Sequence, residues 1–125
     1  MSADWPFGDL HRGGFKASAD HREIAWLISI EDVEALFVAQ GGCCALSGAP
    51  LTFRTGWKYK RFANASLDRI DNNRPYERGN IQLVTSDVNF AKQQLSVAEF
   101  ISLCRSVVEC ADRAKNEATK FDEVA

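Results

Sequence analysis

The sequence lacks any apolar run that approaches the roughly 18 residues needed to cross a membrane. Its first residues, MSADWPFGDLHRGG, carry an early acid and no apolar core region, so they do not resemble a secretory leader. We therefore expect a soluble, cytoplasmic protein with no membrane partner. At 125 residues the chain is long enough for one domain with a modest core and too short for two.

Histidine is scarce, and the cysteines do not form a metal-binding or disulfide pattern. The four cysteines include no C-x-x-C pair, and two of them, Cys43 and Cys44, are adjacent. In a cytosolic chain this pattern favours reduced thiols over a disulfide framework. The two histidines, His11 and His21, lie in an N-terminal segment, residues 1–22, which has no sustained periodicity and is expected to be irregular.

The chain has no overall excess of positive charge, since its net charge is -2, but its basic residues are concentrated in one stretch. Residues 51–92 hold eight basic and four acidic side chains, which makes this segment +4 and leaves -6 for the rest. A locally basic face on an acidic body is compatible with phosphate binding, and a solvated loop rich in Lys and Arg is the alternative. The candidate nucleic-acid-binding residues are Lys58, Lys60, Arg61, Arg74, Arg78 and Lys92.

Two helices are predicted from capping residues and apolar spacing. Ser29 can cap the first, whose opening turn is acidic and which Gly41 and Gly42 should end. Ser96 and Glu99 form an S-x-x-E capping box at the start of the second. Most of this second helix is expected to be core, with Cys104 and Cys110 as core thiols; its apolar residues are Phe100, Ile101, Leu103, Cys104, Val107 and Val108. We expect the domain to span residues 23–112, followed by a C-terminal tail at residues 113–125 that frays from Lys115.

A strand, turn, strand and helix are predicted within about 30 residues between the two helices. Residues 65–71 alternate apolar and polar side chains, as a strand does, and Asn72-Asn73-Arg74-Pro75 is turn chemistry. Residues 80–85 read as the second strand, after which Ser86 can cap a helix over residues 87–94. A hairpin packed under a helix would bring Asp68 of the first strand near Asn89 of the helix. Two such oxygen ligands on rigid elements would suit a hydrated divalent ion.

The strings S-L-D-R-I-D, P-Y-x-x-G-N-I-Q-L-V and D-V-N-F-A-K, in this order and spacing, resemble the HNH endonucleases of the ββα-metal superfamily. The resemblance is in particular to small phage-type members with a D-R-I-D strand, and it covers roughly residues 24–108. It implies an α+β domain in which a ββα-metal motif, a β-hairpin plus a helix, is flanked by supporting helices. It also implies DNA as the substrate and one Mg²⁺ or Mn²⁺ ion as the cofactor.

The resemblance assigns a role to several residues. Asp68 and Asn89 match the family's metal ligands, and Asn80 matches the middle Asn, whose side chain braces the loop between the strands. Lys92 lies one helical turn after Asn89 and is expected to meet a phosphate. Tyr76 is expected to be a packing residue rather than a catalytic one.

The general base departs from the family pattern, because Arg69 stands where the family has its His. Arginine stays protonated and has no acceptor lone pair, so it does not deprotonate water. Asp71, predicted to share a strand face with Arg69, is one substitute base. A base from His11, His21 or the substrate phosphate, with Arg69 stabilising negative charge, is a second solution. A degenerate domain that binds nucleic acid without cutting it is a third.

The zinc site of many HNH domains is also altered, since the positions of its four cysteines match Cys44, Ser47, Thr85 and Val88. One cysteine does not make a closed tetrahedral site, so no structural zinc is expected and apolar packing should hold the domain together.

The resulting hypothesis is a metal-dependent DNA endonuclease that makes single-strand cuts, with Asp68, Arg69, Asp71, Asn80 and Asn89 as its candidate catalytic residues. A module that binds nucleic acid or a protein partner without cleaving is the alternative, and RNA stays open as a substrate. Neither the recognition sequence nor the oligomeric state follows from the sequence. A homodimer, or assembly into a larger phage or defence complex, therefore stays open as an alternative.

Overall fold

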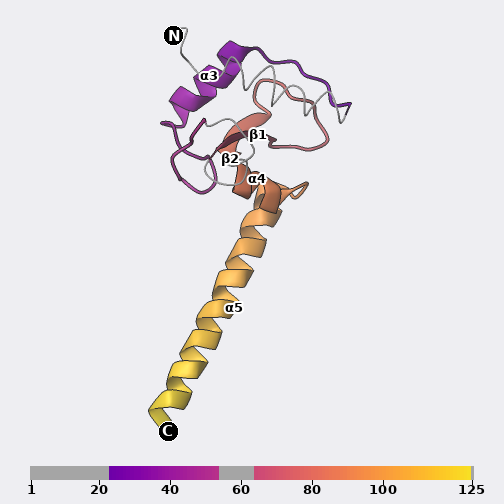
Figure 1. Ribbon diagram of the computed structural model, residues 1–125. Coiled ribbons are helices and arrows are strands. Elements are labelled where there is room, and N and C mark those ends of the chain that lie inside the picture. Colours follow the sequence, from indigo (N-terminus) through magenta and orange to yellow (C-terminus); the bar gives the residue numbers. More distant parts are fainter. Residues whose placement is uncertain (1–22, 54–63, 125) are drawn as a thin grey trace. The chain divides into compact units, whose positions relative to one another are not determined.

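The computed structural model describes residues 23–53 and 64–124, with side chains to residue 118 (Figure 1). Along this part of the chain the elements run α3 (Ile30–Ala39), β1 (Ala65–Arg69), β2 (Ile81–Thr85), α4 (Ser86–Lys92) and α5 (Val97–Val124). The predicted α+β class is confirmed. The chain divides between Gln93 and Gln94 into two units, which are described separately below.

Helix α3 begins at a reciprocal cap. The Ser29 hydroxyl accepts the Asp32 N–H at 3.2 Å, and the Asp32 carboxylate accepts the Ser29 N–H at 2.8 Å. The helix ends where Gly41 and Gly42 adopt positive φ angles of 64° and 73°, a conformation that glycine adopts at little cost. Both predicted ends of this helix are therefore confirmed. The bond from the Ser29 N–H to the Asp32 carboxylate was not predicted.

Strands β1 and β2 form an antiparallel hairpin in which Asp68 pairs with Gln82 and Arg69 with Ile81. β1 is shorter than predicted, since it ends at Arg69 rather than at residue 71. The last backbone bond is from the Ile70 N–H to the Asn80 carbonyl at 2.9 Å, whereas the Asn80 N–H turns to the Glu77 carbonyl at 3.0 Å instead of returning to β1. Beyond this point the Asn80 Oδ1 accepts the Asp71 N–H at 2.7 Å.

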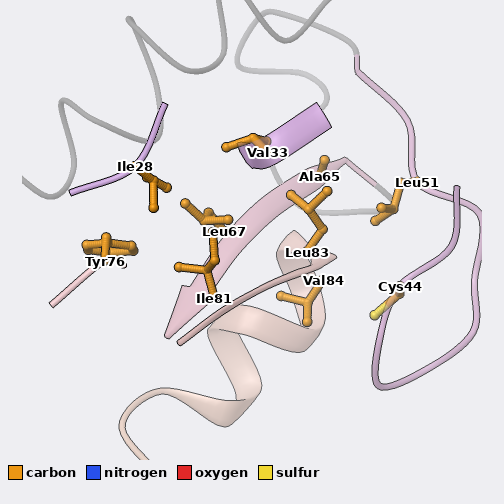
Figure 2. Close-up of a cluster of buried hydrophobic side chains, with 10 residues drawn as sticks. All are labelled: Ile28, Val33, Cys44, Leu51, Ala65, Leu67, Tyr76, Ile81, Leu83 and Val84. Carbon is orange, nitrogen blue, oxygen red and sulfur yellow. The ribbon is translucent and has the colours of Figure 1, made fainter. Parts of the chain in front are cut away.

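Both faces of the hairpin are covered. Neighbouring side chains on a strand point to opposite faces, yet Leu83 and Val84 are both fully buried. α3 packs against β2, and α4 packs against both strands. Figure 2 shows the side chains of the buried apolar cluster gathered about the hairpin. Its members are Ile28, Val33, Cys44, Leu51, Ala65, Leu67, Tyr76, Ile81, Leu83 and Val84.

Helix α4 starts one residue earlier than predicted, with Thr85 as its N-cap. The Ser86 hydroxyl, expected to cap, instead donates to the Asn64 carbonyl at 3.1 Å. The helix ends at Lys92 because Gln93 has a φ of 49°, outside the helical region. α4 is therefore a two-turn helix pinned at its start to the residue before β1.

Helix α5 forms the second unit. The predicted capping box is confirmed: the Glu99 N–H donates to the Ser96 hydroxyl at 3.1 Å, and the Ser96 N–H donates to the Glu99 carboxylate at 3.0 Å. The helix runs on to Val124, through the residues expected to fray. The described part of its unit holds this helix alone, so within that unit the face expected to be core has nothing to pack against. Its apolar residues from Ile101 to Val108 are exposed, at 43% and 57% for those two, and Cys104 and Cys110 are exposed thiols. Apolar periodicity identifies a helix face but not what covers it. No helix in the described ranges is long and apolar enough to cross a membrane.

Candidate functional site

Five polar side chains meet between the hairpin and α4, and we call them the β1–α4 cluster. Ser66 and Asp68 project from alternate positions of β1, so they share one face of the hairpin, and Gln82 pairs with Asp68 from β2. Asn89 and Lys92 are three residues apart on α4, which places them on one helix face. The cluster consists of Ser66, Asp68, Gln82, Asn89 and Lys92.

Asp68, the first predicted ligand, is 4% exposed and both of its carboxylate oxygens have partners. Oδ1 lies 3.2 Å from the ammonium of Lys92, and Oδ2 accepts the Gln82 amide at 2.9 Å. A carboxylate this deeply buried needs such compensation, because leaving water costs several kcal/mol per ion. Asp68 is therefore held in one orientation by two neighbours.

Lys92 is fully buried, which differs from the expectation that it contacts a phosphate. Position 92 does lie on the same face of the helix as Asn89, as predicted. That face, however, is turned towards β1, so the four-carbon side chain reaches the Asp68 carboxylate and not the solvent. In this arrangement Lys92 neutralises Asp68.

Asn89, the second predicted ligand, is half-buried and donates its Nδ2 to the Ser66 hydroxyl at 2.6 Å. This bond fixes the side chain over β1, two residues from Asp68 along the strand. It uses the amide nitrogen and not the amide oxygen, which is the atom that a metal ion would take. The two predicted ligands thus lie over the same face of the hairpin.

The donor set fits a hard divalent ion by type. Mg²⁺ and Mn²⁺ take carboxylate and amide oxygens, and Asp68 and Asn89 offer one group each. The Lys92 ammonium, a stand-in cation at Oδ1, shows that this carboxylate accepts positive charge from the α4 side. Within residues 23–53 and 64–124 no group of three or more His, Cys, Asp and Glu side chains comes together. From the described residues, an ion at this point would take two side-chain ligands, Asp68 and Asn89, and its other positions would be left to other ligands such as water or substrate.

Asn80 makes the bonds expected of a residue that braces the loop. It is 1% exposed, its Oδ1 accepts the Asp71 N–H at 2.7 Å, and its Nδ2 donates to the carbonyls of Asp71 and Pro75 at 3.0 and 2.9 Å. Both N–H groups and the oxygen of the amide are used. The side chain thereby ties the start of the inter-strand loop to its later part.

Arg69, at the predicted base position, is engaged with that same loop. Its guanidinium donates to the carbonyls of Asn72 at 2.8 Å and Arg74 at 2.9 Å. It also lies 5.4 Å from the centre of the Tyr76 ring, a cation–π distance. Tyr76 is buried in the apolar cluster, which agrees with its predicted packing role. Alternation along β1 directs Arg69 to the face opposite Asp68.

Asp71, the substitute base, is exposed and lies in the loop. The prediction that it shares a strand face with Arg69 is wrong, because β1 has ended two residues earlier. Its Oδ1 accepts the Asn73 N–H at 2.9 Å, the pattern of an Asx turn. The carboxylate is thus open to solvent at the rim of the loop.

The candidate nucleic-acid-binding residues are only partly within the described chain. Arg74 and Arg78 are exposed and paired, Arg74 with Glu77 and Arg78 with Asp32 of α3 at 2.7 Å. The remaining basic candidates of the segment, Lys58, Lys60 and Arg61, lie outside the described residues, as do His11 and His21.

Three of the four zinc-matching positions, Cys44, Ser47 and Thr85, are joined by hydrogen bonds to sulfur. The Cys44 Sγ is buried and accepts the N–H groups of Ser47 and Thr85, both at 3.4 Å. Burial raises the pKa of the Cys44 thiol, but the hydrogen bonds from Ser47, Leu46 and Thr85 outweigh it, so the net pKa is lowered. One sulfur therefore links two of the segments that a zinc ion would otherwise join.

Sequence reasoning missed Ser66 and Gln82. Gln82 could have been found from strand register, because the residue opposite a buried carboxylate in an antiparallel pair is its nearest cross-strand neighbour. Ser66 had a weaker signal, a small hydroxyl residue two positions before Asp68 on the same strand face. Comparisons of this chain with family models, curated proteins and solved structures found no match.

Proposed function

We propose that this chain is a divalent-metal-dependent endonuclease of the HNH type, which hydrolyses DNA phosphodiester bonds and nicks one strand at each site. The observation that supports this proposal is the position of Asp68 and Asn89 over one face of the hairpin, each held by a hydrogen bond to a β-strand side chain. Two oxygen ligands fixed on a strand and a following helix suit an ion that must keep positions free for phosphate.

Mg²⁺ or Mn²⁺ bound there would supply Lewis-acid stabilisation of the negative charge that develops on the phosphate. Asp68 and Asn89 would hold it. Asn80 keeps the adjoining loop in one conformation through its three backbone bonds. Asp71, exposed at the rim of that loop, would accept the proton from the attacking water.

The test is relaxation of a supercoiled plasmid with Mg²⁺ or Mn²⁺, and with EDTA as the blank. The variants are Asp68→Asn, which keeps the shape of the side chain, and Asn89→Ala. Asp87→Asn is the matched control, because it removes an exposed acid from the same helix. We expect the first two to lose nicking and the control to retain it. Equal nicking by the wild type and the folded Asp68→Asn and Asn89→Ala variants sinks the proposal, and a parallel RNA substrate tests the nucleic-acid class.

A non-cleaving module that binds nucleic acid is the second candidate, and the buried Asp68–Lys92 pair is the observation that favours it. A ligand carboxylate that already has an internal counter-ion needs no metal. On this alternative, a fluorescent DNA duplex would bind equally with EDTA and with Mg²⁺. Affinity would fall with rising salt as phosphate contacts are screened, and no strand would be cut.

A further inference from the structure

The ammonium of Lys92 contacts one carboxylate oxygen of Asp68 in the interior of the protein. The ammonium lies 3.2 Å from Oδ1, and the two side chains are 0% and 4% exposed. The second oxygen holds the Gln82 amide at 2.9 Å. A metal ion approaching Asp68 therefore meets a carboxylate that has a protein partner at each oxygen.

An ammonium and a divalent ion do not share one carboxylate oxygen at this depth. Like charges a few ångströms apart repel strongly where little water screens them. Lys92 has a means of leaving, because it is the last residue of α4 and has a flexible four-carbon stem. The chain therefore has two ways to neutralise Asp68, one internal and one supplied from solution.

We propose that Lys92 is a built-in competitor of the metal ion, so that Asp68 holds either the Lys92 ammonium or a divalent ion. This inference rests on the proposed function for the identity of the ligand. In the state described here, the Asp68–Lys92 ion pair is formed and lowers the affinity of Asp68 for the metal ion. The metal-bound form would release the Lys92 ammonium, leaving it free to contact a phosphate oxygen of the nucleic acid.

Coupling between the metal and phosphate follows. Because the released ammonium gains a partner when a phosphodiester is present, the metal should bind more tightly to the complex with nucleic acid than to the free protein. Linkage requires the reverse effect to be equal, so the ion should raise the affinity for nucleic acid by the same factor.

The experiment titrates Mn²⁺ into the full chain, followed by calorimetry and by the electron paramagnetic resonance signal of free Mn²⁺. Lys92→Gln removes the charge and keeps a hydrogen-bond donor for Asp68, whereas Lys92→Arg keeps the charge. We expect Lys92→Gln to bind Mn²⁺ about tenfold or more tightly than wild type, and Lys92→Arg to show no gain. The Asp68→Asn/Lys92→Gln double variant should lose the gain, which assigns it to the Asp68 carboxylate.

Circular dichroism confirms that each variant is folded; if Lys92→Gln is unfolded without metal, Mn²⁺ should restore its folding, because the ion then supplies the missing counter-charge of Asp68, and failure of Mn²⁺ to do so overturns the inference. Equal Mn²⁺ affinity in wild type and the folded charge-free variant overturns the inference, as does the absence of Mn²⁺ binding in all of them. Tight binding by Lys92→Gln without plasmid nicking by any variant supports the inference and defeats the nuclease proposal. If the wild type nicks the plasmid and Lys92→Gln binds Mn²⁺ no more tightly than wild type, the nuclease proposal is supported and the competition by Lys92 is ruled out.

Discussion

Gln82 faces Asp68 directly across the hairpin and donates its amide to the carboxylate oxygen that Lys92 does not contact, at 2.9 Å. A buried acid thus receives a neutral donor from the neighbouring strand and a charged donor from the following helix. The orientation of Asp68 depends on both neighbours, which can be removed separately.

Replacing Gln82 with Leu should destabilise the protein by about 1–3 kcal/mol, because it leaves Oδ2 of a buried carboxylate without a donor. The measurement is urea unfolding followed by circular dichroism. In an Asp68→Asn background the same substitution should cost less, since a neutral amide tolerates the loss of a donor better. Equal losses in the two backgrounds would show that Gln82 acts by packing alone.

Removing the charge of Lys92 should cost more. Lys92→Ala leaves Asp68 buried and unpaired, for which we expect a loss of about 3–5 kcal/mol in the free energy of unfolding. The double variant Asp68→Asn/Lys92→Met, which removes both charges, should recover much of that loss. A double variant no more stable than Lys92→Ala contradicts the view that the penalty comes from an uncompensated charge.

Asn80→Ala should loosen the inter-strand loop. The substitution removes three hydrogen bonds of a side chain that is 1% exposed, and we expect a loss of at least about 2 kcal/mol. Hydrogen exchange at the Asp71 amide, whose acceptor is the Asn80 Oδ1, should accelerate selectively. Exchange at the Leu83 amide, which donates to the Gln40 side chain and not to Asn80, serves as the internal control.

The N-terminal cap of α3 should make the free energy of unfolding depend on pH in the acidic range. The pKa of the Asp32 carboxyl is lowered, first by the hydrogen bond from the Ser29 N–H and further by Arg78. A carboxyl whose folded-state pKa is depressed contributes stability above its ordinary value of 3.8 and loses it as the pH falls through the folded-state value. Asp32→Asn should therefore be less stable than wild type by about 0.3–1 kcal/mol near neutral pH. The difference should shrink in unfolding curves recorded below that ordinary pKa, and a difference that stays constant with pH would contradict this prediction.

Much of the local structure followed from short-range chemistry. Ser29 with Gly41 and Gly42 marks both ends of α3, and the Ser96 and Glu99 pair marks the start of α5. These signals are local because a cap needs only residues within one turn. The bracing role of Asn80 was inferred from resemblance, and the hydrogen bonds supply its physical basis.

The partners of the long side chains were not predictable in the same way. Helical spacing assigns Lys92 to the face of Asn89, but a lysine on that face reaches a phosphate or a carboxylate depending on the angle at which α4 lies over β1. Alternation in the sequence continues through Asp71 and so favours a strand there, whereas in the structure the Asn80 N–H donates to the Glu77 carbonyl and the ladder ends before Asp71. Such outcomes depend on tertiary contacts, which periodicity does not contain.

The amide of Gln40, at the end of α3, pairs with both backbone groups of Leu83: its Oε1 accepts the Leu83 N–H at 3.0 Å and its Nε2 donates to the Leu83 carbonyl at 2.9 Å. The Ala45 N–H donates to the same carbonyl at 3.0 Å. A two-stranded hairpin has two free edges, and each is a template on which another extended chain can add. Gln40 and Ala45 block the outer edge of β2 at its centre, so a second molecule cannot extend this sheet there without first displacing the end of α3. Self-association by strand addition along β2 is thereby disfavoured, because the Gln40 amide and the Ala45 N–H already use the backbone groups that an added strand would pair with.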